Sequence, residues 1–170
     1  NDFDFDKIIV SSPAFLKRVM LLNIFKHNTL TISAGGAISD LVIENVKKSF
    51  GKNIFEIFGS TETGFMAGRF VENQASLWRC PVESNFYVAS EDFTIVDKGI
   101  GVLVIDSPYI SDDIKKDVVL ADSRKIRAFV SEDLVELNNG TLKLLGRIGR
   151  VIKIEDNRVS LDYLQSQLIK

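Results

Sequence analysis

The chain has 170 residues, of which 45% are hydrophobic and 26% are charged, a composition typical of a folded globular protein rather than a disordered one. Its formal net charge of -2 provides no electrostatic attraction to nucleic acid or to an anionic membrane, and no apolar run is long enough to span a bilayer. The single cysteine, Cys80, excludes an internal disulfide and fits a reducing compartment, so we expect a cytoplasmic protein. The first residue is not methionine, and we expect the chain to be a piece of a longer protein.

In the first third of the chain, strand-like and helix-like patterns alternate. Short apolar runs and helically spaced apolar residues follow one another at residues 7–10, 13–22, 30–33, 40–50 and 54–58. Ser12 and Pro13 suit the start of the first helix. Asp40 is expected to cap the second helix, and Gly51 is expected to end it. Because a helix separates each strand from the next, this region predicts βαβ crossovers and a parallel sheet.

From about Trp78 onward the pattern changes to short strands separated by turns. The candidates are strands at residues 86–89, 93–96, 102–106, 126–130, 134–137, 142–145, 151–154 and 158–160, and a helix at 161–169. Turn signals at 97–99 and 138–140 separate neighbouring strands, and the polar stretch 111–120 is interpreted as a loop. This half therefore predicts a mostly antiparallel, β-barrel-like sheet, and the fold class of the whole chain is α/β.

Two loops rich in glycine and polar residues follow predicted strands, at residues 33–37 and 59–64. In α/β sheets, ligands bind beyond the carboxyl ends of the strands. Glycine allows close approach of a ligand, hydroxyls and amides suit phosphate oxygens, and a carboxylate such as Glu62 suits a hard divalent cation. Phe58 offers a flat face to a planar ring. Together the loops predict a nucleotide site, with an ordinary surface turn as the alternative.

Five segments, in order, resemble motifs of the adenylate-forming superfamily, which contains acyl-CoA and aryl-CoA synthetases, adenylation domains and luciferases. They are SAGGAIS at 33–39, FGSTETG at 58–64, GVLV at 101–104, SEDL at 131–134, and GR at 146–147 followed by VIKI at 151–154 and RV at 158–159. The FGSTETG segment is the most specific of them. The combination of WR at 78–79, SP at 107–108 and residues 153–161 most resembles ligases of bacterial aryl-polyene or pigment gene clusters.

The resemblance implies an AMP-forming acid–thiol ligase that uses ATP and Mg²⁺. A small carboxylic acid would be activated to an acyl-adenylate and then transferred to the thiol of coenzyme A or of the phosphopantetheine on an acyl carrier protein. Residues 1–76 would form an α/β subdomain, 77–146 an antiparallel β subdomain, and 147–170 the hinge and the start of a C-terminal domain. Because the family's glycine-rich phosphate loop and C-terminal lysine have no match in this chain, we expect the fragment itself to be inactive.

The same resemblance implies residue roles in the first half. The nucleotide-binding set would comprise Gly35, Gly36, Ala37, Phe58, Gly59, Ser60 and Thr61. Phe58 would lie against adenine, Thr61 would act catalytically by hydrogen-bonding the α-phosphate, and Glu62 would bind Mg²⁺. A core position for Phe58 and a purely solvated loop position for Glu62 remain open alternatives.

In the second half, the resemblance implies that Asp133 accepts hydrogen bonds from the ribose hydroxyls and that Arg147 reaches the ribose or phosphate. Lys153 would assist catalysis after a rotation of the domains. Solvated or structural roles remain open for all three. Glu132 replaces a glycine of the family pattern, and Gly149 replaces a charged hinge residue. These departures favour an alternative function, a degenerate nucleotide-binding or scaffolding relative without ligase activity.

Overall fold

The computed structural model describes residues 5–19, 28–51, 53–72, 77–92, 94–148, 151–154 and 157–160. The chain divides into two compact units, Asn1–Trp78 and Arg79–Lys170. Within the described ranges, no helix is both long and apolar enough to cross a membrane.

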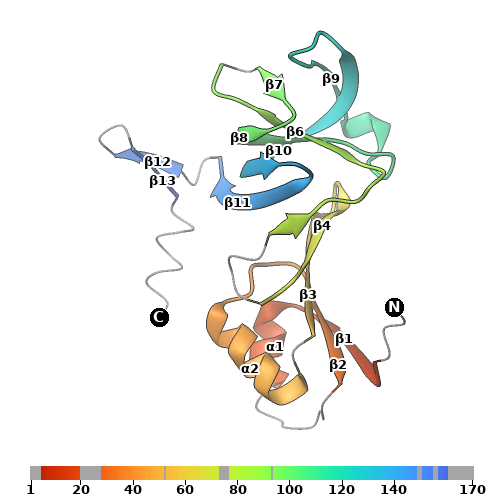
Figure 1. Cartoon of the computed structure of the whole chain (residues 1–170), viewed down its shortest axis with the longest axis vertical. Helices are drawn as coiled ribbons and strands as arrows, with labels where there is room; N and C mark the ends of the chain where they lie inside the picture. Colours follow the sequence, from red (N-terminus) through yellow and green to blue (C-terminus); the bar gives the residue numbers. More distant parts are fainter. Residues whose placement is uncertain are drawn as a thin grey trace. The chain divides into compact units, whose positions relative to one another are not determined.

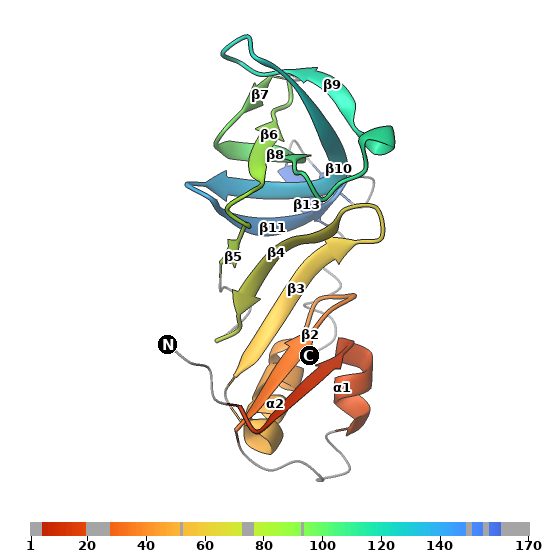
Figure 2. The same cartoon turned by 90° about the vertical axis from the view of Figure 1, so that its right-hand side faces the viewer.

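The first unit consists of a small mixed sheet and two helices. Its elements are β1 (Lys7–Ser11), α1 (Pro13–Val19), β2 (Thr29–Ser33), α2 (Asp40–Phe50), β3 (Ile54–Ser60) and β4 (Gly64–Phe70). Strands β1, β2 and β3 pair in parallel, as the sequence predicts, and β4 returns antiparallel to β3. Both helices lie on one face of the parallel strands (Figures 1 and 2).

The helix ends agree with the sequence expectations at three of four positions. The Ser12 hydroxyl accepts a hydrogen bond from the Phe15 amide at 3.3 Å, and Pro13 is the first residue of α1. Gly51 follows the last residue of α2. The expected Asp40 cap is wrong, because Ser39 is the N-cap and its hydroxyl accepts from the Val42 amide at 3.4 Å. The expected extension of α1 to residue 22 lies outside the described residues.

One core joins the helices to the sheet in this unit. Its buried members are Leu16, Ile38, Val42, Ile43, Val46, Phe50, Ile54 and Val71. The α2 residues among them recur at spacings of three and four, so one stripe of the helix faces β3. This packing holds the segment before α2 against β3, and that segment carries the first glycine-rich loop.

The second unit is built almost entirely from strands. They are β6 (Asn85–Ala89), β7 (Ile95–Val96), β8 (Gly99–Asp106), β9 (Lys116–Val119), β10 (Lys125–Asn138), β11 (Thr141–Arg147), β12 (Val151–Ile154) and β13 (Asn157–Ser160), with β5 (Trp78–Arg79) at the boundary in sequence. Antiparallel pairing gives the order β11-β10-β8-β6-β7, and β9 pairs with the first part of β10 (Figure 2). The segments predicted at 126–130 and 134–137 form the single strand β10, with a register shift between Val130 and Leu134 against β8.

The antiparallel sheet curls like a barrel but is not closed. Where β7 meets the end of β9, the pairing consists of one isolated bridge between Ile95 and Leu120. Inside the curl lies a small core of Tyr87, Ile95, Val104, Leu120 and Ala128. The barrel-like expectation therefore describes the curvature of this unit, although a continuous ladder around it is absent among the described strands.

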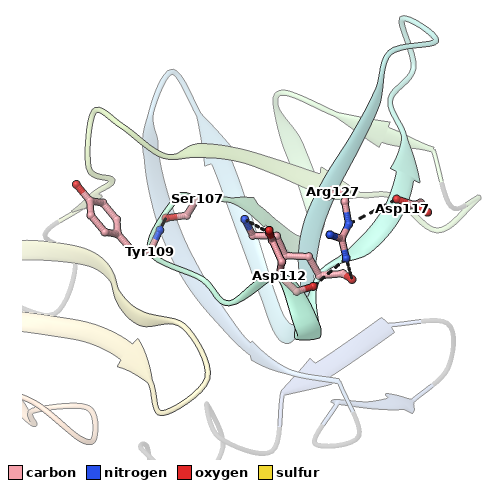
Figure 3. Close-up of polar contacts among 6 residues, drawn as sticks. Ser107, Tyr109, Asp112, Asp117 and Arg127 are labelled. Atoms are coloured by element: carbon pink, nitrogen blue, oxygen red, sulfur yellow. Dashed lines mark hydrogen bonds and ion pairs between the residues drawn. The ribbon is translucent and has the colours of Figure 1, made fainter.

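The stretch 111–120, interpreted as a loop from its polarity, instead contains a 3₁₀ turn, η2 (Asp112–Ile114), and strand β9. Its strand pairs with β10 while its charged side chains remain in solvent, which is why no apolar alternation shows in the sequence. Arg127 on β10 joins the two elements (Figure 3): its guanidinium donates to the Asp112 carbonyl at 2.8 Å and lies 3.8 Å from the Asp117 carboxylate.

Candidate functional site

The FGSTETG segment forms the turn of the β3–β4 hairpin and is held together by its own side chains. Ser60 and Thr63 bond reciprocally: each backbone amide donates to the other residue's hydroxyl at 3.3 Å. The two hydroxyl oxygens are 2.9 Å apart, and Thr63 is buried. The Ser60 hydroxyl, expected from the sequence to face a ligand, is thus engaged within the turn.

Thr61 and Glu62 occupy the tip of this turn, and both are exposed. The reciprocal bonds between Ser60 and Thr63 close the turn immediately behind them. The structure therefore presents one hydroxyl and one carboxylate side by side on a support that is already hydrogen-bonded. This is a suitable arrangement for binding phosphate and a hard cation.

Gly59 is required by the close approach of the two hairpin strands. A Cβ atom at this position would lie 2.1 Å from the carbonyl oxygen of Gly64. The pairing also shifts by one residue between Phe58 and Gly59. Any larger residue at 59 would push the tip of the hairpin away from its observed place.

The first glycine-rich loop runs from the end of β2 to α2. Gly35 has a φ of +84°, and Cβ atoms at Gly35 and Gly36 would meet no heavy atom within 4 Å. The backbone at Gly35 and Gly36 is therefore open to close approach by a ligand, and the expected backbone contacts of Gly35, Gly36 and Ala37 to a nucleotide stay a prediction.

A buried ion pair lies beneath this loop, and no pattern in the sequence indicates it. Glu56 on β3 and Arg69 on β4 are cross-strand neighbours that are only 1% and 8% exposed. Arg69 Nε and Nη2 approach Glu56 Oε2 at 2.8 and 2.7 Å. The other carboxylate oxygen, Oε1, accepts a hydrogen bond from the Ile38 amide at 3.0 Å. Both oxygens of one buried carboxylate are thus engaged.

Phe58 is half-buried beside an aromatic and cationic stack. Its ring centroid lies 5.7 Å from that of Trp78, with the planes tilted by 58°. The Arg69 guanidinium carbon lies 4.4 Å from the centre of the Trp78 ring. Phe58 is therefore packed on one side without being fully enclosed, which leaves both sequence interpretations, core residue and adenine platform, open.

Asp133 and Arg147 meet in the second unit. They are directly opposite on β10 and β11, and Arg147 Nε lies 3.2 Å from Asp133 Oδ1. Asp133 lies within the irregular part of β10, between Val130 and Leu134, and its amide donates to the Ser131 hydroxyl at 2.9 Å. Burial raises the pKa of the Asp133 carboxyl above its usual range, and the charge and hydrogen bond of Arg147 oppose that rise.

The structure brings the predicted residues together in two sets. In the first unit, the 35–38 loop and the β3–β4 hairpin are joined through Glu56. In the second unit, Asp133 and Arg147 are in contact. Lys153 lies in β12, opposite Arg158 on β13, and its side chain is outside what the structure describes.

The chemistry of the first set fits a nucleotide with Mg²⁺. Mg²⁺ usually binds through one or two carboxylates together with substrate phosphates and water, rather than in an all-protein cage. Glu62 supplies one exposed carboxylate of this kind. Within the described residues, no group of three or more His, Cys, Asp or Glu side chains could form such a cage.

No protein-family model and no curated protein sequence matches the chain. Solved structures do. A four-domain nonribosomal peptide synthetase bound to AMP and glycine has a TM-score of 0.73 at 20% identity, over 93% of this chain and 13% of that one. The anthranilate CoA ligase AuaEII in complex with anthranoyl-AMP has a TM-score of 0.70 at 16% identity, over 95% of this chain and 34% of that one. MatB from Rhodopseudomonas palustris has a TM-score of 0.70 at 15% identity, over 95% of this chain and 35% of that one.

These neighbours are adenylate-forming enzymes, and the chain spans about a third or less of their length. The similarity extends over both units of the chain, from the parallel strands to the antiparallel sheet. The described chain therefore has the fold of one part of an adenylate-forming enzyme.

Proposed function

We propose that the chain is the nucleotide-contacting part of an AMP-forming acid–thiol ligase of the acyl-CoA synthetase type. The observation that carries the proposal is the exposed Thr61–Glu62 tip on a self-bonded hairpin, within a fold shared with adenylate-forming enzymes. The complete protein, rather than this chain alone, would perform the reaction.

The proposed reaction has two steps. A carboxylate oxygen of the acid attacks the α-phosphorus of ATP, the bond to the β-phosphate oxygen breaks, and pyrophosphate leaves. A thiol then loses its proton as its sulfur attacks the acyl carbon, the carbon–oxygen bond to the phosphate breaks, and AMP leaves. Coenzyme A or a carrier-bound phosphopantetheine would supply that thiol. Positioning and charge stabilisation are the contributions that such a site makes to both steps.

In this proposal the first unit contacts the base and phosphates. Backbone atoms of Gly35, Gly36 and Ala37 line the base and the acyl group, and the Phe58 ring lies against adenine. The Thr61 hydroxyl donates to the α-phosphate. Bound Mg²⁺ would neutralise charge on the phosphates, with Glu62 as its ligand from this chain. The open space at Gly35 and Gly36 and the exposure of the hairpin tip support these roles.

The second unit would contact the ribose. A carboxylate can accept from two hydroxyls at once, and Asp133 already has one oxygen near Arg147. Arg147 is 56% exposed at its side chain, so it is accessible to a ribose or phosphate oxygen. We propose Lys153 as an additional catalytic contact in the thiol-transfer step.

The substrate is proposed to be a small carboxylic acid. Two of the structural neighbours were solved with such groups, glycine in one and the anthranoyl adenylate in another. These groups belong to those proteins, and for this chain they define only the class of compound to test. An acyl carrier protein is the corresponding candidate partner for the second step.

The test is acid-dependent exchange of labelled pyrophosphate into ATP by the full-length protein that contains this chain. The panel holds hydroxybenzoic and cinnamic-type acids, medium-chain fatty acids and amino acids. Exchange with one class establishes the first step and identifies the acid. Binding of ATP without exchange for any acid contradicts the ligase proposal and favours the degenerate relative.

Site variants test the residue roles in the same assay. Glu62→Gln and Asp133→Asn should each lower kcat/KM for exchange by about 100-fold, because each removes a charged contact to the nucleotide or its cation. Glu44→Gln and Glu136→Gln are matched controls, since both carboxylates are exposed on α2 and β10 away from the proposed contacts. Wild-type exchange rates in both site variants would contradict the assignment.

A further inference from the structure

We infer that the buried Glu56–Arg69 ion pair is a positioning device that sets both nucleotide-facing loops of the first unit at once. The inference rests on the proposed function and extends it to two residues that touch neither base nor phosphate in that proposal. Glu56 acts on the loop at 35–38, and Arg69 acts on the start of the hairpin turn through Trp78.

Glu56 constrains the first loop through a backbone contact. Its Oε1 accepts from the Ile38 amide at 3.0 Å, and Ile38 is only 1% exposed. A buried amide that loses its acceptor has no water to replace it, so this hydrogen bond fixes where the loop enters α2. Ile38 comes directly after Ala37 and before the N-cap Ser39, so a shift at Ile38 would displace the backbone of residues 35–37.

Arg69 constrains the second loop from the other end of the pair. Two of its nitrogens bind the same oxygen of Glu56, and its guanidinium lies over the Trp78 ring. Trp78 in turn contacts Phe58, the residue that begins the FGSTETG turn. The orientation of the guanidinium therefore determines the position of Trp78, and with it the packed side of the Phe58 ring.

Stability alone does not account for this pair. Replacing a buried ion pair with apolar side chains of similar volume is often neutral or stabilising, because desolvation offsets much of the attraction between the charges. What an apolar pair cannot provide is the acceptor for the Ile38 amide or a cation for the Trp78 ring. The pair is satisfied only when both loops occupy their observed places, and that is the property a positioning device requires.

The experiment compares four forms of the full-length protein. They are the wild type, Glu56→Gln, the apolar double variant Glu56→Leu/Arg69→Met, and Leu16→Ala as a stability control. Leu16 lies on α1, outside both loops, and is fully buried in the core of the same unit. Its truncation therefore lowers stability while the ion pair keeps its contacts to the Ile38 amide and to Trp78. The apolar double variant carries no buried charge, so it should stay folded even if single variants at Glu56 do not.

Two measurements are made on each form: amide hydrogen exchange in peptides covering 34–39 and 57–64 without nucleotide, and the KM for ATP and kcat in pyrophosphate exchange. We expect the double variant to exchange amides at least tenfold faster in both peptides and to raise the KM for ATP about tenfold, the effect of losing one charged hydrogen bond. Leu16→Ala should leave the KM for ATP unchanged, because the folded fraction keeps its loops. Glu56→Gln retains an acceptor for Ile38 and should fall between the wild type and the double variant.

The outcomes separate this inference from the function on which it rests. An unchanged KM for ATP in the double variant, or an equal rise in Leu16→Ala, overturns the inference while the ligase function stands. If the wild type shows no pyrophosphate exchange, the proposed function fails. The amide-exchange data then decide whether the ion pair positions the two loops. Wild-type amide exchange in both peptides of the double variant would then overturn the positioning of the loops as well.

Discussion

Each unit contains an acid–arginine pair close to the proposed nucleotide contacts, Glu56–Arg69 in the first and Asp133–Arg147 in the second. Both pairs join neighbouring antiparallel strands, and they differ in almost every other respect. Glu56 and Arg69 are nearly inaccessible, with two short contacts and a further hydrogen bond to backbone. Asp133 and Arg147 share one contact at 3.2 Å, and the arginine side chain is 56% exposed. The same two functional groups therefore occupy a closed setting in one unit and an open one in the other.

The difference shows how environment assigns a role to the same chemistry. The partners of the buried pair are all provided by the protein, so that pair can only hold structure. In the second pair the Arg147 side chain is 56% exposed, and burial raises the pKa of the Asp133 carboxyl group. A pair of that kind can exchange part of its internal contact for a contact with a ligand, at a small cost in stability.

The largest expected effect comes from removing one carboxylate from each pair. Glu56→Ala leaves the Arg69 charge buried without compensation and should lower the free energy of unfolding by about 3–5 kcal/mol. Asp133→Ala should change the free energy of unfolding by no more than about 1 kcal/mol, because the partner Arg147 is solvated. Hydrogen exchange of β3 and β10 amides over a urea series measures both losses in the full-length protein. Equal losses would remove the distinction between a closed and an open pair.

An intermediate effect is expected from exchanging arginine for lysine. Lysine carries a compact charge and cannot make two contacts from one planar group. Arg69→Lys should therefore lose one of the two bonds to Glu56 and the flat contact with Trp78, which should lower the free energy of unfolding by about 2 kcal/mol. Arg147→Lys should lower it by less than about 0.5 kcal/mol. The same urea series reports both values, and a larger loss at Arg147 would reverse the comparison.

The smallest effect concerns the titration of Asp133. Because its pKa in the folded state is raised, the folded protein binds this proton more tightly than the unfolded chain does. The stability contributed by Asp133 is thus present below the ordinary carboxyl pKa and lost as pH rises through the raised value. Carboxyl ¹³C NMR should place its midpoint above the ordinary range, and Arg147→Met should raise it further, since Arg147 is the main opposing influence. A midpoint at or below the ordinary value would contradict the burial argument.

Elements with a regular pattern could be predicted from the sequence. Apolar runs and helix-cap residues identify β1, β2, β3 and both helices, and the Asn-Gly pair at 139–140 marks the β10–β11 turn, where both residues have positive φ. Strand β4 could not be recognised in this way. Four successive residues of it, Met66 to Arg69, are buried, so both faces are covered and the strand shows no alternation.

The buried pair was beyond prediction for a geometric reason. Counting back from the Ser60–Gly64 pair at the turn places Glu56 opposite Gly68, which would put Arg69 on the other face of the hairpin. The register shift between Phe58 and Gly59 adds one residue and makes Glu56 and Arg69 partners. A single irregularity in the ladder, marked in the sequence only by Gly59, thus decides whether the two charges meet. The residues around FGSTETG could be singled out from the sequence, whereas the group beneath them could not.

The buried pair also limits how the sequence of this region can change over time. A neutral residue at either position alone leaves an uncompensated charge at a site that is 1% or 8% exposed, so each single change passes through an unstable intermediate. Relatives of this chain should therefore carry the acid and the arginine together or lack both. An alignment of such relatives should show these two columns varying in concert, with a change in the residue at position 78 accompanying the loss of the arginine.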